Sequence, residues 1–264
     1  MIKIENVDVC GWGAAIRGAR NPMNSWDKID SDYCAKHLTD LNECKKCQHY
    51  NADGHFCDNV PYIVGPNDKK LLQGLANAGP DHGKFLRYLI VQLDITAPFY
   101  WWKEFKTYRK GRKFMDDGDE ILDPEEFEMF IETNSCSTMH KIHEKEFTLD
   151  DFSHEHLIND INECWATDIE AGPECISTPL DILECVVFAL NKYREKFLET
   201  KDKRYWWQLI QLLPSSYNQR RTVQLNSQVL KSLYHARKNH KLDEWREFCS
   251  WIKTLPYSEL IIDG

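Results

Sequence analysis

Long hydrophobic runs are missing from this sequence of 264 residues, since no stretch approaches the eighteen consecutive apolar residues of a membrane-spanning helix. Residues 1–20 also lack the basic region, apolar region and small-residue cleavage site of a secretory signal. The hydrophobic fraction of 42% is ordinary for a globular protein. We therefore expect a soluble, cytoplasmic protein that does not bind a membrane.

An excess of positive charge is missing too. The 42 acidic residues outnumber the 33 lysines and arginines, and the formal net charge is -9. Proteins that hold long nucleic acids depend on a basic surface that releases counterions. This class of partner is therefore disfavoured, and an anionic ligand must meet a local basic pocket. The chain also has no internal repeat, no low-complexity tract and no G-x-S-x-G nucleophile motif.

Ten cysteines are present, and without a secretory signal we expect free thiols or metal ligands in place of disulfides. Six occur singly and are interpreted mostly as small buried hydrophobic residues. These six are Cys10, Cys136, Cys164, Cys175, Cys185 and Cys249. The other four form a C-x9-C-x2-C-x9-C pattern within an aperiodic Cys/His-rich excursion over residues 21–65. They are Cys34, Cys44, Cys47 and Cys57.

The cysteine pattern has three interpretations. Cys44 and Cys47 have the spacing with which two thiolates bind tetrahedral zinc, and a structural zinc would stabilise a long aperiodic segment. Free cysteines in a loop are the alternative. A redox role for the Cys44-x2-Cys47 pair is disfavoured, because no strand leads into it as in a thioredoxin-like motif.

Hydrophobic periodicity and turn residues predict most of the remaining elements. Residues 3–20 predict a strand followed by a helix, on which Arg17 and Arg20 share one face that can be ordinary solvated surface. Residues 68–78 predict a short helix that ends at Gly79. Residues 84–93 predict a strand, which the Thr96-Ala97-Pro98 segment follows as the start of a helix.

The second half of the chain is predicted to be mostly helical. Residues 111–133 are acidic and are interpreted as a surface insertion. The C-terminal hundred residues are expected to be helical throughout, starting at a Thr178-Pro179 cap. Later helices are expected at about 203–212, 221–238 and 242–254. Two aromatic runs, Phe99 to Trp102 and Tyr205 to Trp207, suit a core or subunit interface by default, and a stacking surface as the alternative.

The segment LLPSSYNQRRTVQLNSQVLKSLYHAR places Asn226 twelve residues after Pro214 and Arg237 eleven residues after Asn226. This pattern resembles the C-terminal signature of flavin-dependent thymidylate synthases, in which a Leu-Pro-x-x-x-Tyr turn enters a helix that bears the Asn. Upstream, His82 in GPDHGKF resembles the family's Glu-His-x-x-Phe element, and Asn134 to Ser137 resembles its Asn-Glu-x-Ser element. The opening AAIRGAR is a weaker match, and the family's Arg-His-Arg signature falls at 107–109.

The resemblance implies an α/β (α+β) fold, with a central sheet and a large helical C-terminal part in a single domain over residues 1–264. It further implies a homotetramer with nucleotide pockets between subunits, and it extends to proteins of bacteria and their phages. The implied roles are catalysis by Ser137 and Arg237; FAD binding by His82, Tyr108, Arg109, Asn226 and Gln228; and substrate binding by Ser135, Ser137, Gln211 and Arg237.

The chain departs from the family where that family binds its nucleotide. Arginines of the family pattern are replaced by Thr107, Met139 and Ile210, while Ser135 replaces a glutamate and Gln228 an arginine. Arginine binds phosphate through bidentate charge-assisted hydrogen bonds, and loss of one such partner typically costs about 1–3 kcal/mol. Four arginines remain as candidates for compensation, although two of them also suit a surface pair at a helix start. They are Arg109, Arg237 and the pair Arg220 and Arg221.

Three functions remain open from the sequence. The first is a nucleotide-binding protein that has diverged in ligand and sequesters a nucleotide without catalysis. The second is an active thymidylate synthase, in which FAD passes a hydride from reduced nicotinamide to a deoxyuridylate-type substrate that carries a methylene from folate. The third is an all-helical interaction module whose loop is held by zinc.

Overall fold

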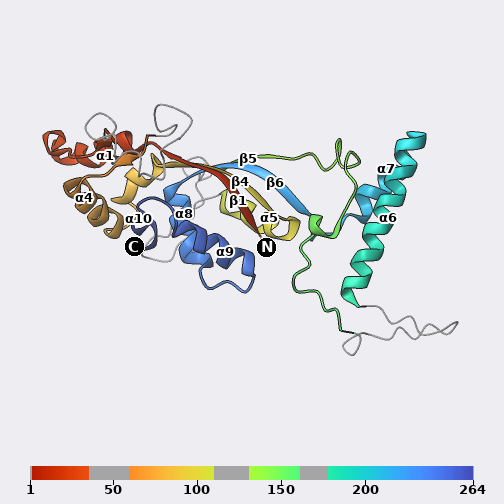
Figure 1. Ribbon diagram of the computed structural model, residues 1–264. Coiled ribbons are helices and arrows are strands. Elements are labelled where there is room, and N and C mark those ends of the chain that lie inside the picture. Colours follow the sequence, from red (N-terminus) through yellow and green to blue (C-terminus); the bar gives the residue numbers. More distant parts are fainter. Residues whose placement is uncertain (1, 36–59, 110–130, 161–177, 264) are drawn as a thin grey trace, which may run out of the picture. The chain divides into compact units, whose positions relative to one another are not determined.

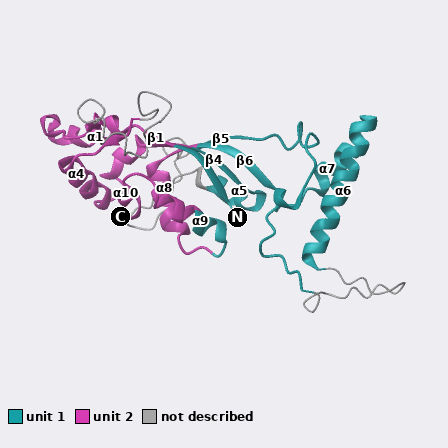
Figure 2. Cartoon of the chain, viewed as in Figure 1, with its two compact units in different colours: residues 1–7, 93–223, 241–247 teal, residues 8–92, 224–240, 248–264 magenta. Residues whose placement is uncertain are grey.

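The computed structural model describes residues 2–35, 60–109, 131–160 and 178–263 (Figure 1). They form two compact units (Figure 2). Unit 1 comprises residues 1–7, 93–223 and 241–247, and unit 2 comprises residues 8–92, 224–240 and 248–264. Among the described residues, no helix is both long and apolar enough to cross a bilayer. The prediction of a single domain stays a prediction.

A four-stranded sheet with the order β1-β4-β6-β5 and a set of helices confirm the predicted mixed α/β class. The all-helical interaction module is therefore wrong. The strands are β1 (Lys3–Cys10), β4 (Ile90–Pro98), β5 (Ile131–Ser135) and β6 (Asn218–Asn226). The predicted strand and helix over residues 3–20 are confirmed, since α1 (Trp12–Arg20) follows β1. Gly11 between them has φ 96°, and a Cβ there would lie 1.9 Å from Tyr88 O, which only glycine avoids.

The Cys/His-rich excursion is closed at its base by local structure. Strands β2 (Asp32–Tyr33) and β3 (Tyr62–Ile63) pair antiparallel across it. Arg20 is buried and forms an ion pair of 2.6 Å with the buried Asp68 of α4 (Pro66–Asn77), so its interpretation as solvated surface was wrong. Arg17 is exposed, as expected. The helix predicted at 68–78 is confirmed, and Gly79 after it is left-handed at φ 101°.

Two strand boundaries differ from the prediction. Gly83–Arg87 forms the 3-10 helix η3, and the strand begins only at Ile90. Thr96, Ala97 and Pro98 end β4 and do not start the helix; α5 (Phe99–Phe105) begins one residue later. The reason is a period of two along β4, in which buried residues alternate with more exposed ones.

The helix predicted over 221–238 is confirmed from Ser227 onward, but residues 221–226 belong to β6, so its predicted start and the fully helical C-terminal part were wrong. Buried residues alternate along β6 as they do along β4, and α8 (Ser227–Arg237) starts only after the strand. Two of the inward side chains are polar, Gln219 and Arg221. They interrupt the apolar pattern from which a strand is normally recognised.

The helices of unit 1 include α6 (Pro179–Thr200) and α7 (Lys203–Leu212), which pack against each other; α6 starts at the predicted cap and α7 has the predicted bounds. Thr178 caps α6 through a complete capping box.

The aromatic run of α5 is largely core, because Trp101, Trp102 and Phe105 are fully buried. The remaining elements are η1 (Asn21–Met23), η2 (Trp26–Lys28), η4 (Lys106–Arg109), η5 (Leu149–Asp151), α9 (Asp243–Ile252) and α10 (Glu259–Ile262).

Candidate functional site

The predicted site residues fall into two groups, one in each unit. Unit 2 contains His82, Asn226, Gln228 and Arg237, whereas unit 1 contains the predicted substrate residues other than Arg237. Tyr108 and Arg109 lie in η4 of unit 1, and their side chains are outside what the structure describes. Each group is a candidate half-site with its own local geometry.

In unit 2, the His82-Gly83 turn lies beside the start of α8. The turn is formed by the amides of His82 and Gly83, which donate to Gly79 O at 3.1 and 2.9 Å. A Cβ placed on Gly83 would lie 3.8 Å from Gln228 Oε1. Since His82 is exposed and Gln228 half-buried, both side chains are accessible to a ligand. The structure therefore brings these two predicted residues into one region.

Asn226 has a structural task that its predicted place inside a helix did not suggest. It is the last residue of β6 and the N-cap of α8, and its Oδ1 accepts a hydrogen bond of 3.0 Å from Val229 N. The next amide, that of Ser227, donates to Leu89 O at 2.9 Å and so holds the start of the helix on unit 2. A side-chain oxygen that satisfies a helix N-terminus is a common use of asparagine.

Arg237 lies at the C-terminal end of α8, where positive charges gather. Lys238 and Lys253 lie 5.7 and 6.0 Å from the ring centroid of Tyr234. Burial raises the pKa of the nearby Cys249 thiol to about 11, although the charges of Lys253 and Arg237 oppose that shift. We call Arg237, Lys238 and Lys253 the α8 basic end. In a protein of net charge -9, it is a local basic patch of the kind that an anionic ligand needs.

In unit 1, Ser137 lies in an exposed turn directly after β5, of which Ser135 is the last residue. Its Oγ accepts a hydrogen bond of 2.9 Å from His140 N and lies 3.2 Å from His140 Nδ1. The turn is held on β6, because Gln219 Nε2 donates to Cys136 O at 2.7 Å. We call residues 137–140 the Ser137 turn. The Ser137 hydroxyl is thus fixed within the turn by His140, and the residue itself is exposed.

The Ser137 turn contacts α7, the helix that carries Gln211. Trp206 Nε1 donates a hydrogen bond of 2.9 Å to Met139 O. Gln211 is exposed and lies four residues after Trp207, which places both on one face of α7. Ser137 and Gln211 are therefore carried by elements in direct contact. Trp207 has 43% of its surface exposed, so it is not part of the core, and the subunit interface expected as the other default stays a prediction.

The three positions where arginines of the family pattern are replaced have separate environments. Met139 is 52% exposed. Ile210 is partly buried and packs against the hydrophobic cluster between α6 and α7. Thr107 Oγ1 donates to Glu104 O at 2.7 Å. Thr107 and Met139 are exposed, so a long side chain at either position would reach solvent, whereas one at position 210 would disturb the packing.

Arg220 and Arg221 are strand residues, so their interpretation as a helix-start pair was wrong. Arg220 lies on the outer face of β6 and forms an ion pair of 2.6 Å with Asp94. Arg221 is buried on the inner face, with its guanidinium 4.3 Å from the Trp102 ring centroid and its Nε 3.0 Å from Gln219 Oε1. Both arginines have defined structural contacts within unit 1.

The described residues contain no group of three or more His, Cys, Asp or Glu side chains placed to hold a metal ion. Cys34 is described, and its amide donates to Pro61 O at 2.9 Å, which extends the β2–β3 ladder. Cys44, Cys47 and Cys57 lie outside the described residues. The zinc site therefore stays a prediction.

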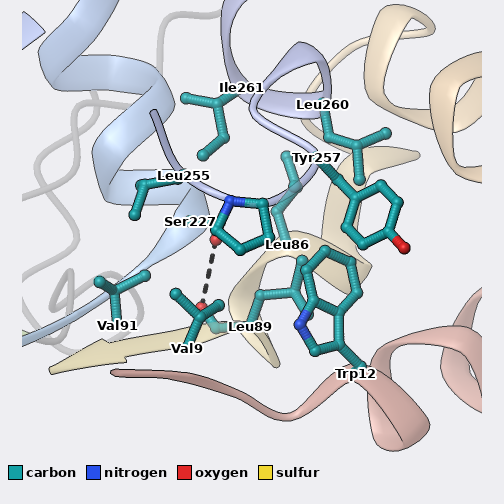
Figure 3. Close-up of a pocket in the computed structure, with 11 residues that line it drawn as sticks. Val9, Trp12, Leu86, Leu89, Val91, Ser227, Leu255, Tyr257, Leu260 and Ile261 are labelled. Atoms are coloured by element: carbon teal, nitrogen blue, oxygen red, sulfur yellow. Dashed lines mark hydrogen bonds between the residues drawn. The ribbon is translucent and has the colours of Figure 1, made fainter. Parts of the chain in front are cut away.

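A small cavity in unit 2 is lined by apolar residues of β1, α1, β4 and α10, together with Ser227 (Figure 3). Its volume of about 10 Å³ holds no more than one water molecule. Ser227 Oγ donates to Leu89 O at 3.4 Å at its edge. The cavity is thus too small for a cofactor or a nucleotide.

No protein-family model and no curated protein matches this chain. Solved structures show that its fold is that of flavin-dependent thymidylate synthases. The enzyme of this class from Helicobacter pylori, complexed with FAD and dUMP, is similar with a TM-score of 0.56 at 15% identity, over 99% of this chain and 98% of that chain. A second structure of the Helicobacter pylori enzyme with FAD and dUMP has a TM-score of 0.55 at 15% identity, over 100% and 98% of the two chains.

A UMP/dUMP methylase from Streptomyces cacaoi, bound with 5-Br dUMP, is similar with a TM-score of 0.50 at 13% identity, over 98% of this chain and 94% of that chain. Identities this low show the fold alone. The fold predicted from the spacing of the sequence motifs is confirmed.

Proposed function

We propose that this protein binds a nucleotide on a flavin-dependent thymidylate synthase fold, that its ligand has diverged, and that it holds this ligand without turnover. The observation that carries the proposal is the fold likeness over 99% of the chain to an enzyme complexed with FAD and dUMP. We further propose a homotetramer with the pockets between subunits, as the sequence resemblance implies.

The unit 1 half-site supports a change of ligand. It keeps a fixed serine hydroxyl, and it carries Thr107, Met139 and Ile210 where the family pattern has arginines. Each lost charge-assisted hydrogen bond weakens binding by about 1–3 kcal/mol, so three losses correspond to roughly a 100-fold to 1,000,000-fold lower affinity. A phosphate bound as the family pattern implies would therefore be held poorly, and another mode of binding is required.

The unit 2 half-site favours an alternative, an active FAD-dependent methyltransferase that acts on a deoxyuridylate-type substrate. FAD would supply the hydride transfer when bound. The residues present suit such a cofactor, since the accessible His82 ring and the Gln228 amide can hydrogen-bond to a flavin ring. The α8 basic end suits its diphosphate. Flavin binding alone therefore does not distinguish a non-catalytic nucleotide-binding protein from an active methyltransferase. A measurement of turnover distinguishes them.

Three measurements on the purified protein test the proposal. Mass spectrometry of the small molecules released on denaturation identifies a ligand that copurifies, and calorimetry measures the binding of dUMP and FAD. Turnover is measured as conversion of dUMP to its methylated product, with a methylene-bearing folate as the carbon donor and reduced nicotinamide as the hydride source. We expect nucleotide binding that Arg237→Ala weakens and that Arg17→Ala, at an exposed position of α1, leaves unchanged.

The outcomes separate the candidates. Nucleotide binding without methyl transfer supports the proposal. A yellow protein that forms the methylated product supports the alternative and contradicts a role limited to sequestering. A protein that releases no nucleotide and binds neither dUMP nor FAD contradicts both.

A further inference from the structure

An exposed aromatic and basic surface lies on α7, next to the Ser137 turn. The indole rings of Trp206 and Trp207 pack edge to face, with centroids 4.9 Å apart. The ammonium of Lys203 lies 5.8 Å from the Trp206 centroid and 5.6 Å from the Trp207 centroid. We call Lys203, Trp206 and Trp207 the α7 platform.

The two tryptophans of the platform have different tasks. Trp206 is half-buried and uses its Nε1 to hold Met139 O at 2.9 Å, so it anchors the Ser137 turn to α7. Trp207 leaves 43% of its surface exposed. Its neighbour on the same helix face is Gln211, an exposed amide one turn further on. The platform thus offers a flat apolar ring beside hydrogen-bonding groups that a ligand can reach.

Lys203 adds an available positive charge. Among the residues that the structure describes it forms no ion pair, whereas the adjacent Arg204 is engaged by Asp202 at 2.7 Å. A cation above an exposed indole is held weakly, and a nucleobase stacked on the same ring gains more. A ligand ring can therefore take the place of the ammonium on Trp207, while the flexible lysine stem lets Lys203 turn toward an anionic group of the same ligand.

We propose that the α7 platform is a base-stacking subsite for the nucleotide: Trp207 stacks on the base, Lys203 meets the phosphate, and the Ser137 turn lies alongside. This inference rests on the proposed function and specifies how its ligand is held. Recognition then depends more on the flat base than on the phosphate, because a single mobile ammonium replaces the guanidinium groups of the family pattern. A nucleoside without phosphate should retain much of the affinity.

The test compares dUMP with deoxyuridine by calorimetry, using the full-length protein. Base stacking contributes about 5-fold to 150-fold in affinity, so Trp207→Leu should weaken both ligands by that factor and Trp207→Tyr should restore most of it. Lys203→Gln should weaken dUMP several-fold and leave deoxyuridine unchanged. Thermal melts of the variants check folding, which an exposed side chain should not disturb.

Helix α6 provides matched controls within the same pair of helices. Lys192 lies 5.6 Å from the ring centroid of Phe188, which is 65% exposed, so the pair has the same chemistry as the platform. Phe188→Leu and Lys192→Gln should leave both affinities unchanged.

Three results would overturn the inference. If the wild-type protein binds both ligands and Trp207→Leu binds them as tightly, the platform is not the subsite, whereas the proposed function stands. If Trp207→Leu changes the subunit number in light scattering and leaves affinity unchanged, the platform is a subunit contact. If the wild-type protein binds neither ligand, the inference fails, and the proposed function fails with it only if the protein also releases no nucleotide on denaturation.

Discussion

The ion pair between Arg20 and Asp68 should make a large contribution to the stability of unit 2. Asp68 is fully buried and Arg20 is 5% exposed. Asp68 Oδ1 accepts from Arg20 Nε and Nη2, both at 2.6 Å. Asp68 Oδ2 accepts from Ser31 Oγ at 2.6 Å and from Asp30 N at 3.0 Å. One carboxylate therefore joins α1, the start of the Cys/His-rich excursion and α4.

The substitution Asp68→Asn keeps the shape of the side chain and removes its charge. It leaves the Arg20 guanidinium buried without its counter-ion, and breaking a buried pair in this way costs about 3–5 kcal/mol. For a chain of this size each kcal/mol lowers the melting temperature by roughly 2–4 °C, so the expected fall is about 6–20 °C. Removing both charges together, as Arg20→Met with Asp68→Leu, should cost less than Asp68→Asn alone.

Urea unfolding and thermal melts followed by circular dichroism measure this effect. Arg17→Met is the matched control, because Arg17 lies on the same helix, is exposed, and should change stability by less than about 0.5 kcal/mol. A loss below about 1 kcal/mol for Asp68→Asn would show that the pair is not desolvated as the structure indicates.

Three further predictions concern the cap, the sheet and the metal. Asn226→Ala should lower stability by about 1 kcal/mol in urea unfolding, whereas Asn226→Ser keeps the cap and the stability; equal losses would contradict the capping role. Hydrogen bonds from Thr222 and Arg220 hold the pKa of Asp94 well below its ordinary value, so Asp94 stabilises the fold above about pH 4 and this stabilisation is lost as the pH falls further. The difference in unfolding free energy between wild type and Asp94→Asn should therefore shrink at low pH. A difference that does not change with pH would contradict stabilisation by the ionised carboxylate. Inductively coupled plasma mass spectrometry should find about one zinc per chain in the wild-type protein and none in Cys44→Ser. A wild-type protein without metal would exclude the zinc site.

Helices whose ends are marked by capping residues could be predicted from the sequence. A strand that buries polar side chains could not. Thr178 and Pro179 mark the start of α6, and Gly79 marks the end of α4, because capping and left-handed backbone require particular residue types. Strand β6 carries Gln219 and Arg221 toward the core. Their burial depends on partners in other elements, namely Trp102 and the backbone of Cys136, which no local pattern reveals.

The sequence indicated which residues belong to the candidate site, but only part of how they are arranged in space. Spacing alone indicated His82 and Gln228, and the structure places them in one region of unit 2. It also indicated Asn226, whose capping role depends on a strand end that the sequence pattern concealed. The α7 platform had a weak signal, the four-residue spacing of Lys203, Trp207 and Gln211. The sequence does not reveal whether a tryptophan is exposed or buried.

Two positions at which the family pattern has arginines have structural tasks in this chain. Ile210 packs against the α6–α7 cluster, so this position now contributes to the core of unit 1. An arginine there would bury an uncompensated charge among apolar side chains, which is costly. At position 139 the side chain is exposed, and it is the backbone carbonyl that matters, because Trp206 holds it. Both positions therefore serve packing within unit 1: Ile210 supports the pairing of α6 with α7, and the carbonyl of Met139 fixes the Ser137 turn beside the α7 platform that we propose as the base subsite.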